Sequence, residues 1–317
     1  SDLTEDLLGD LELPEEITPQ LRIFSLNYAL QEDERFDEVG PAGEVLWFLH
    51  RLEPEPVKNT PLYLQYHPID YNRSLLTSEM LALEKQLADE WSDLEAPEEP
   101  QEEVVITLTA PHRLSGTLPI SNRSAQIFPT GRTQRIRFMW IDKLNDAELP
   151  GWVIREGRYV YGLEKWYAEN NIPIGAYIKV SRGAKPGTVN IHPLKSRSRR
   201  EWIRIALESG GQLTFEMRKE LIVCDYDDSI IIAGESAEAV ENAWHYVHEN
   251  DLPLSKLIDL AFPELAKLSP QGTVNAATLY SAINLTWRTP PGPILAELVT
   301  NDRYVPVGDN YWVLHTS

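Results

Sequence analysis

Cysteine is almost absent from this sequence. The 317 residues include one, Cys224, so no internal disulfide can form, and its place in the apolar run LIVC predicts a buried thiol. No apolar run approaches the roughly 18 residues that span a bilayer. The opening residues SDLTEDLLGDLELPEE lack the basic and apolar regions of an export signal. These absences favour a cytoplasmic protein in a reducing compartment, with no membrane partner.

The motifs of the common enzyme classes are also missing. The sequence contains no GxxxxGK followed by Ser or Thr, no GxGxxG after a predicted strand, and no HExxH, CxxC or GxSxG. We therefore expect a non-catalytic protein with no metal and no cofactor.

Two polar clusters could still carry chemistry. His245 and His248 lie three residues apart on a predicted helix, but no third ligand is near in the sequence, so a solvated pair is expected. Carboxylates beside a lysine can hold Mg²⁺ in a nuclease, and such a cluster comprises Asp225, Asp227, Asp228, Glu216 and Lys219. Because its aspartates lie where a hairpin must turn, we interpret them as turn residues.

Positive charge is scarce overall but concentrated in the middle of the chain. The net charge is −20. Residues 1–101 carry −18, residues 102–208 carry +7 and residues 209–317 carry −9. A basic block between acidic blocks is typical of phosphate contact, because clustered Lys and Arg release condensed counterions from nucleic acid. Solvated surface charge is the alternative interpretation.

The central residues alternate with the period of β-strands. In QRIRFMWID, Ile136, Phe138 and Trp140 point to one side while Arg135 and Arg137 point to the other. The segment GWVIREGRYVYGL predicts a hairpin, EKWYAENN a short helix, and AYIKVSR and TVNIHPL two strands joined by a Pro-Gly turn. About six strands around one helix predict a closed or partly closed barrel.

An acidic, proline-interrupted linker precedes this region, and a helical C-terminal part follows it. SDLEAPEEPQEE cannot bury a core, and SEMLALEKQLADEW before it predicts a helix. After KSRSRR, the runs WIRIALE, LTFEMRKELIVC and SIIIAG predict three more strands, and SAEAVENAWHYVHEN predicts a helix that Ser236 caps. We expect four parts: an N-terminal acidic unit (1–91), the linker (92–103), the basic barrel module with its following strands (104–235), and a C-terminal domain (236–317).

The two ends of the chain echo one another. ALQEDERFDEVGPAGEVLWFL, residues 29–49, and ELVTNDRYVPVGDNYWVL, residues 297–314, share a helix end, an arginine before an aromatic residue, Val-Gly and Trp-x-Leu. A helix followed by a two-stranded ribbon is how a winged helix ends. Trp47 and Trp312 should therefore pack equivalently against their helices.

Several motifs of residues 104–192 occur in a familiar order: GTLPIS, Phe128-Pro129, Asp142, Trp152-Val153, Tyr161-Gly162-Leu163, Trp166, and the strand that begins near Ile174 and ends at Arg182. In this order the region resembles the DNA-binding pseudobarrel typified by the plant B3 domain and the recognition domain of some restriction enzymes. The echo segments resemble the helix-wing end of the HARE-type winged helix. Together the resemblances imply an α+β fold: a central β-rich pseudobarrel with one short helix, flanked by winged-helix-like units.

The B3-like resemblance also implies two arms in the major groove. By position, the arms contain His112, Arg113, Ser115, Asn122, Arg123, Arg155 and Arg158. Arginine and asparagine can read guanine and adenine edges. Other basic residues of this region would contact phosphates: Arg132, Arg135, Arg137, Lys179, Arg182, Lys185, Lys195, Arg197, Arg199 and Arg200.

These observations predict a regulatory or defence-associated protein that binds double-stranded DNA. The main alternative is a protein-interaction scaffold in which the acidic winged-helix-like ends bind a protein partner and the barrel is structural. A metal-dependent nuclease is a second alternative. A barrel that binds a small ligand or single strands is a third; its platform would be Trp140, Trp152, Trp166, Tyr159, Tyr161 and Tyr167, although such residues usually form the core.

Overall fold

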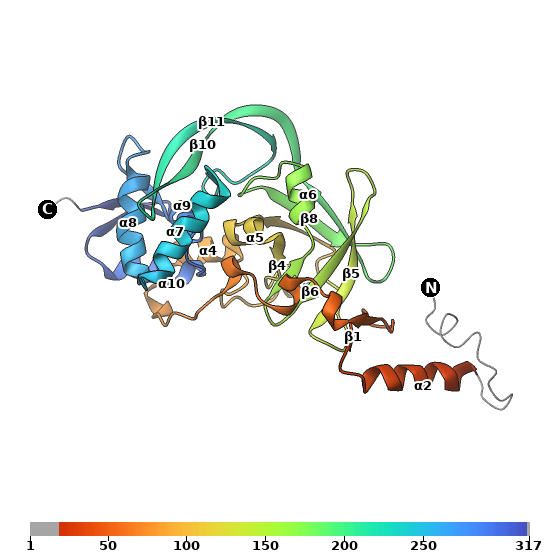
Figure 1. Cartoon of the computed structure of the whole chain (residues 1–317). Helices are drawn as coiled ribbons and strands as arrows, with labels where there is room; N and C mark the ends of the chain where they lie inside the picture. The colour runs from red at the N-terminus through yellow and green to blue at the C-terminus, as the bar shows by residue number, and fades with distance from the viewer. Residues whose placement is uncertain (1–18, 316–317) are drawn as a thin grey trace.

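A seven-stranded sheet lies at the centre of the structure, a computed structural model that describes residues 19–315 (Figure 1). Its strand order is β3-β8-β9-β5-β6-β7-β4, and it curls into a nearly closed barrel. Only the β5–β9 pair is parallel among the pairings within this sheet. The strands are β3 Glu103–Thr107, β4 Thr117–Pro119, β5 Arg135–Asp142, β6 Glu148–Ile154, β7 Tyr159–Tyr161, β8 Tyr177–Arg182 and β9 Thr188–Pro193. The predicted α+β fold with a central barrel-like sheet is confirmed.

The alternation of apolar and polar residues correctly predicted strand β5. Its buried and half-buried residues alternate along the whole strand, and Ile136, Phe138 and Trp140 all lie inside the barrel. The rings of Phe138 and Trp140 meet edge to face at 4.8 Å, a favourable aromatic geometry. The predicted hairpins β6–β7 and β8–β9 are also present.

Two short helices accompany the barrel, of which one was predicted. The expected helix is α6, Glu164–Glu169. The additional helix is α5, Ala110–Ser115, with a proline in its first turn and Gly116 at φ +65° after its end. Proline at the start and a left-handed glycine at the end are both favourable helix signals. The segment for which the resemblance implied a groove-binding arm therefore begins as a helix packed on the barrel.

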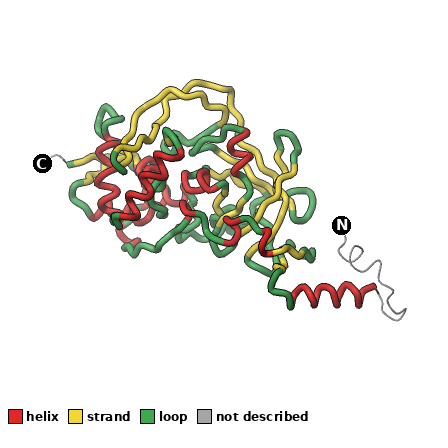
Figure 2. The backbone as a smooth tube through the Cα atoms, in the orientation of Figure 1, coloured by secondary structure: helices red, strands yellow, loops and turns green. Residues whose placement is uncertain are grey.

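A long hairpin joins the barrel to the C-terminal helices. It consists of β10, Lys195–Ser209, and β11, Gln212–Cys224, and β12, Ile232–Gly234, pairs with β10 in parallel. Figure 2 shows it as the long pair of strands that arches over the molecule. One side of the hairpin contributes Ile203 and Ile222 to the barrel core, and nearer its tip the other side contributes Phe215 to the helical core.

The C-terminal unit combines helices with a small sheet. The predicted helix, α7, begins after Ser236, whose side chain accepts a hydrogen bond from the Ala239 amide at 3.0 Å, and it buries Val240, Ala243 and Val247. The unit contains α7 Ala237–Glu249, α8 Leu254–Ala266, α9 Ala276–Ile283, α10 Pro291–Thr300, β13 Val274–Asn275, β14 Tyr304–Gly308 and β15 Tyr311–Leu314. No helix within residues 19–315 is both long and apolar enough to cross a membrane.

Both echo segments form a helix followed by two antiparallel strands, as predicted. At the C-terminus these are α10, β14 and β15, and Trp312 is buried in the same core as Ile294 and Leu298 of α10. At the N-terminus, Trp47 is only partly buried, and its indole donates a hydrogen bond to Asn27 of the preceding helix at 2.9 Å. The prediction that the two tryptophans pack equivalently is therefore wrong, because the second copy is covered by a helical core and the first is not. That N-terminal copy consists of α2 Pro19–Gln31, β1 Phe36–Glu38 and β2 Trp47–Leu49.

The segment between β2 and the barrel is mostly irregular. Its main helix, α4, is the predicted one and follows Thr77, whose hydroxyl accepts from the Met80 amide. The predicted linker, residues 92–103, forms neither helix nor strand except at Glu103, where β3 begins. The short elements of this segment are η1 His50–Leu52, α3 Glu55–Lys58, η2 Leu62–Leu64, η3 Arg73–Leu75 and α4 Ser78–Leu87.

A fully buried ionic network holds these parts together. The Arg288 guanidinium lies 2.8 Å from Asp89 and 2.7 Å from Glu90, and Tyr280 donates to Asp89 at 2.6 Å. On the barrel side, His112 Nε2 lies 3.0 Å from Glu90. Burial raises the pKa of Asp89. Burial would also raise the pKa of Glu90, but the charges of Arg288 and His112 outweigh it, so that pKa is lowered.

Replacing this arginine should destabilise the whole protein. Arg288→Met leaves two buried carboxylates without their cation, a change that typically costs about 3–5 kcal/mol. Urea unfolding measures the loss. Arg303→Met removes a surface pair with Asp259 at 2.7 Å and should cost no more than about 1 kcal/mol. Equal stabilities of the two variants would show that the buried network does not hold the units together.

Cys224 should be inert in the native protein. The thiol is buried, as the apolar run predicted, and burial raises its pKa to about 11. The reactive thiolate is therefore scarce at pH 8. We expect slow modification by a disulfide reagent at pH 8 in buffer and rapid modification in denaturant. Rapid native modification would contradict the buried position.

Candidate nucleic-acid interface

The β10–β11 hairpin has one solvent-facing side. Arg200 pairs directly with Leu221, and Trp202 pairs with Lys219. Directly opposite residues of antiparallel strands share a face, and so do residues two positions apart, so these four side chains project together. Trp202 is 63% exposed and Leu221 is 61% exposed. We call this side the outer face of the hairpin; it also includes the next pair, Arg204 and Met217.

The packing of the hairpin explains why a tryptophan is left in solvent. On the opposite side, Ile203 and Ile222 enter the barrel core. Further along the outer face, Phe215 is covered by the helical unit. Arg200, Trp202 and Lys219 therefore lie on the side that faces away from the barrel core and before the part that the helices cover. Figure 1 shows the hairpin as the arch formed by β10 and β11 at the top of the molecule.

The exposed stretch of the outer face carries positive charge only. From Arg200 to Arg204 the outer face carries no carboxylate, and the first carboxylate on this side is Glu208, nearer the tip. The opposite side carries both signs of charge: Glu201, Glu216 and Glu220 together with Arg199 and Arg218. Neither Arg200 nor Lys219 makes an ion pair with another residue between 19 and 315. A tryptophan between two uncompensated cations is an arrangement that can stack on a base or sugar while its neighbours contact phosphates.

The outer face continues into a hollow. This cavity of about 270 Å³ lies between the hairpin and the small C-terminal sheet, and its lining includes Arg204, Met217, Thr278 and Tyr311. The Arg204 guanidinium donates to the Asp228 carbonyl at 2.6 Å, and burial lowers its pKa. The hydroxyl of Thr278 is buried without a partner among the described residues. The end of the outer face is thus both concave and polar.

Four of the ten predicted phosphate contacts are exposed and make no ion pair within the described part of the chain: Lys185, Lys195, Arg197 and Arg200. Three of these four lie on β10. The other six contact the protein itself. Arg132 pairs with Glu38, Arg135 with Glu53, Lys179 with Glu103 and Arg199 with Glu201, while Arg137 lies over the Phe48 ring and Arg182 donates to the Gln126 carbonyl.

The predicted base-edge residues are mostly engaged in packing. Arg155 donates to three carbonyl groups, including Pro129 at 2.9 Å, and Arg158 donates to the Glu90 carbonyl at 2.7 Å. Arg113 donates to the Ile172 carbonyl at 2.6 Å above the Tyr167 ring. His112 belongs to the buried network, and the rest are partly buried: Ser115, Asn122 and Arg123. The structure thus does not gather these side chains into one exposed groove-reading surface.

The outer face was missed although its signal is present in the sequence. WIRIALE was predicted as a strand, and in a strand Trp202 must point away from Ile203 and toward Arg200 and Arg204. The pairing of Trp202 with Lys219 depends on the hairpin register. That register follows from the turn at Gly210 and Gly211, both with positive φ, which the sequence did indicate.

The other clusters considered from the sequence have structural roles. The Asp227 carboxylate accepts from the Ser229 amide at 2.9 Å, the expected turn contact. The turn does not close a hairpin as predicted, because β12 pairs in parallel with β10 and not with β11. His248 stacks on Trp244 at 3.6 Å and on Trp287 at 5.1 Å, and burial lowers its pKa. The aromatic platform lies in the core, where Tyr161 is partly buried and the other five residues are buried. These five are Trp140, Trp152, Trp166, Tyr159 and Tyr167.

No family model, curated protein or solved structure matches this chain. The B3-like and HARE-type resemblances therefore remain predictions, and the interface is defined by its geometry alone.

Trp202 should matter little for stability. Trp202→Ser removes an exposed ring, so the free energy of unfolding should change by no more than about 0.5 kcal/mol. Trp152→Ser is the matched control, because Trp152 is buried and packs edge to face against Phe48 at 5.1 Å; that change should cost about 3–5 kcal/mol. Urea unfolding measures both. A large loss in the Trp202 variant would mean that its ring serves packing.

Proposed function

We propose that this protein binds double-stranded DNA through the outer face of the β10–β11 hairpin. The observation that carries the proposal is the exposed Trp202 between Arg200 and Lys219, on a stretch of the outer face that carries no carboxylate. Lys195 and Arg197 extend the cationic surface along the same strand.

The two-stranded form of the hairpin supports duplex binding. A two-stranded β-ribbon fits the major groove of B-DNA, and bases there present distinct donors and acceptors. The hairpin is anchored in two cores, so its outer face is held in place before binding. A preorganised contact surface loses less conformational entropy on association.

The acidic ends favour this face over the rest of the surface. Residues 1–101 and 209–317 carry −18 and −9. Their repulsion of phosphate acts over about 10 Å at 0.1 M salt, so association should be steered toward the cationic hairpin.

Loss of the hairpin cations should lower the affinity for DNA and also make that affinity less dependent on salt. In the triple variant Arg197→Gln, Arg200→Gln, Lys219→Gln, the slope of log affinity against log salt should fall in magnitude by about 2.7, since each phosphate contact contributes about 0.9. Fluorescence anisotropy with a labelled random duplex between 50 and 200 mM salt measures the slope. The whole chain is needed, because a fragment ending at residue 208 would separate β10 from β11.

A charge-matched control separates local contact from net charge. Arg51→Gln, Lys85→Gln, Lys256→Gln removes three exposed cations outside the hairpin and should leave the slope nearly unchanged. An equal effect of both triple variants, or no duplex binding by the native chain at 50 mM salt, would contradict the proposal. Tighter binding to single strands than to duplexes would contradict its duplex form.

A second function is favoured by a different observation. Helix α2 carries Phe24 and Tyr28, 65% and 57% exposed, with their rings stacked at 6.4 Å. Exposed aromatic groups of this kind are enriched where proteins meet. We propose that the N-terminal winged-helix-like unit contacts a protein partner. Such binding should weaken in Phe24→Ser and respond little to salt.

A further inference from the structure

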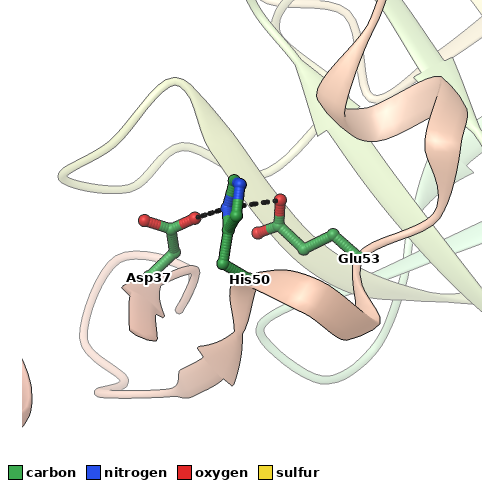
Figure 3. Close-up of side chains that lie close together, drawn as sticks. All are labelled: Asp37, His50 and Glu53. Atoms are coloured by element: carbon green, nitrogen blue, oxygen red, sulfur yellow. Dashed lines mark hydrogen bonds and ion pairs between the residues drawn. The ribbon is translucent and has the colours of Figure 1, made fainter. Parts of the chain in front are cut away.

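Three side chains with metal-binding atoms converge beside the N-terminal ribbon. Asp37 lies in the middle of β1, His50 follows directly after β2, and Glu53 lies three residues further on. Figure 3 shows the imidazole of His50 between the two carboxylates, with all three side chains pointing toward one another. The pairing of β1 with β2 brings Asp37 close to His50 in space.

The spacing of the three groups suits one small cation. His50 Nδ1 lies 2.9 Å from Asp37 Oδ2 and 3.5 Å from Glu53 Oε2, and the three ligand atoms all lie within 4.8 Å of one another. In a tetrahedral zinc site with bonds of about 2.0–2.2 Å, neighbouring ligand atoms are about 3.3–3.6 Å apart. The three atoms are therefore close to the spacing of three ligands in such a site, which leaves the fourth position to water.

Glu53 is the buried member of this cluster. Its side chain is buried, and its Oε1 atom has no hydrogen-bond partner among the residues that the structure describes. Arg135 is the cation facing it, and its guanidinium reaches Oε2 at 3.3 Å. A buried, unpartnered carboxylate oxygen is costly, and a metal ion would supply the missing partner.

We propose that Asp37, His50 and Glu53 bind one divalent transition-metal ion, with Zn²⁺ as the representative. A set of one imidazole nitrogen and two carboxylate oxygens suits zinc and its neighbours better than Mg²⁺ or Ca²⁺, which prefer oxygen ligands alone. Asp37 and His50 are about half exposed on their side chains, so an ion can enter from solvent. The ion would clip the β1–β2 ribbon to the segment that Arg135 of β5 ties to the barrel.

The site is independent of the proposed DNA contact and is tested separately. The whole chain, stripped with a chelator, is titrated with ZnCl₂ by isothermal calorimetry. One saturable site per chain is expected, and Asp37→Asn and His50→Gln should each weaken it by roughly tenfold or more. His245→Gln is the matched control, because His245 is exposed and carries only a distant pair with Glu241 at 3.8 Å; it should bind zinc like the native chain.

The possible outcomes decide the proposal either way. Loss of the site in both ligand variants and not in the control supports it, provided that circular dichroism shows native folding. Should His50→Gln fail to fold, the zinc affinity of Asp37→Asn decides the proposal. Asp37 lies on the surface, and asparagine has the same shape as aspartate. No saturable binding, or binding that His245→Gln weakens as much as the ligand variants do, would overturn it.

Discussion

The ion pairs of Arg288 with Asp89 and Glu90 are the interaction on which the rest of the structure depends. The carboxylates follow α4, the guanidinium belongs to the C-terminal unit, and His112 attaches the barrel to the same cluster. Buried charges are tolerated only when paired, so each unit requires the others in place. This requirement fixes how the barrel and the helical unit are placed relative to each other, and hence where the hairpin that connects them must run.

The proposed interface follows from that placement. The β10–β11 hairpin inserts Ile203 into one core and Phe215 into the other, from opposite sides. Successive side chains of a strand point to opposite sides. Where one side of the hairpin packs on the barrel core, the other side is therefore exposed, and where the other side packs on the helical core, the first side is exposed. Arg200, Trp202 and Lys219 fall in the uncovered part. Their exposure is thus a consequence of two-core packing, and stability does not require an aromatic residue there.

Arginine serves two purposes in this chain, and the sequence does not separate them. Arg155 uses its guanidinium to satisfy three backbone carbonyls at the barrel rim, where a buried acceptor without a donor would be costly. Arg200 has the same chemistry but projects into solvent. The difference is whether loops fold back over the side chain. The family resemblance implied, by position, that seven residues form groove-reading arms. In the structure, three arginines among these seven hold loops and helices together.

The sequence alone determined the features that depend on neighbours along the chain. Alternation identified β5, a serine cap and helical spacing identified α7, and a repeated motif identified the two helix-ribbon ends. Only the tertiary structure decided which charges are buried together and which reach solvent. Asp89 and Arg288 are 199 residues apart, and Glu53 meets Arg135 across 82. Such pairs carry no local pattern, because their energy depends on burial by elements that assemble only when the chain is folded.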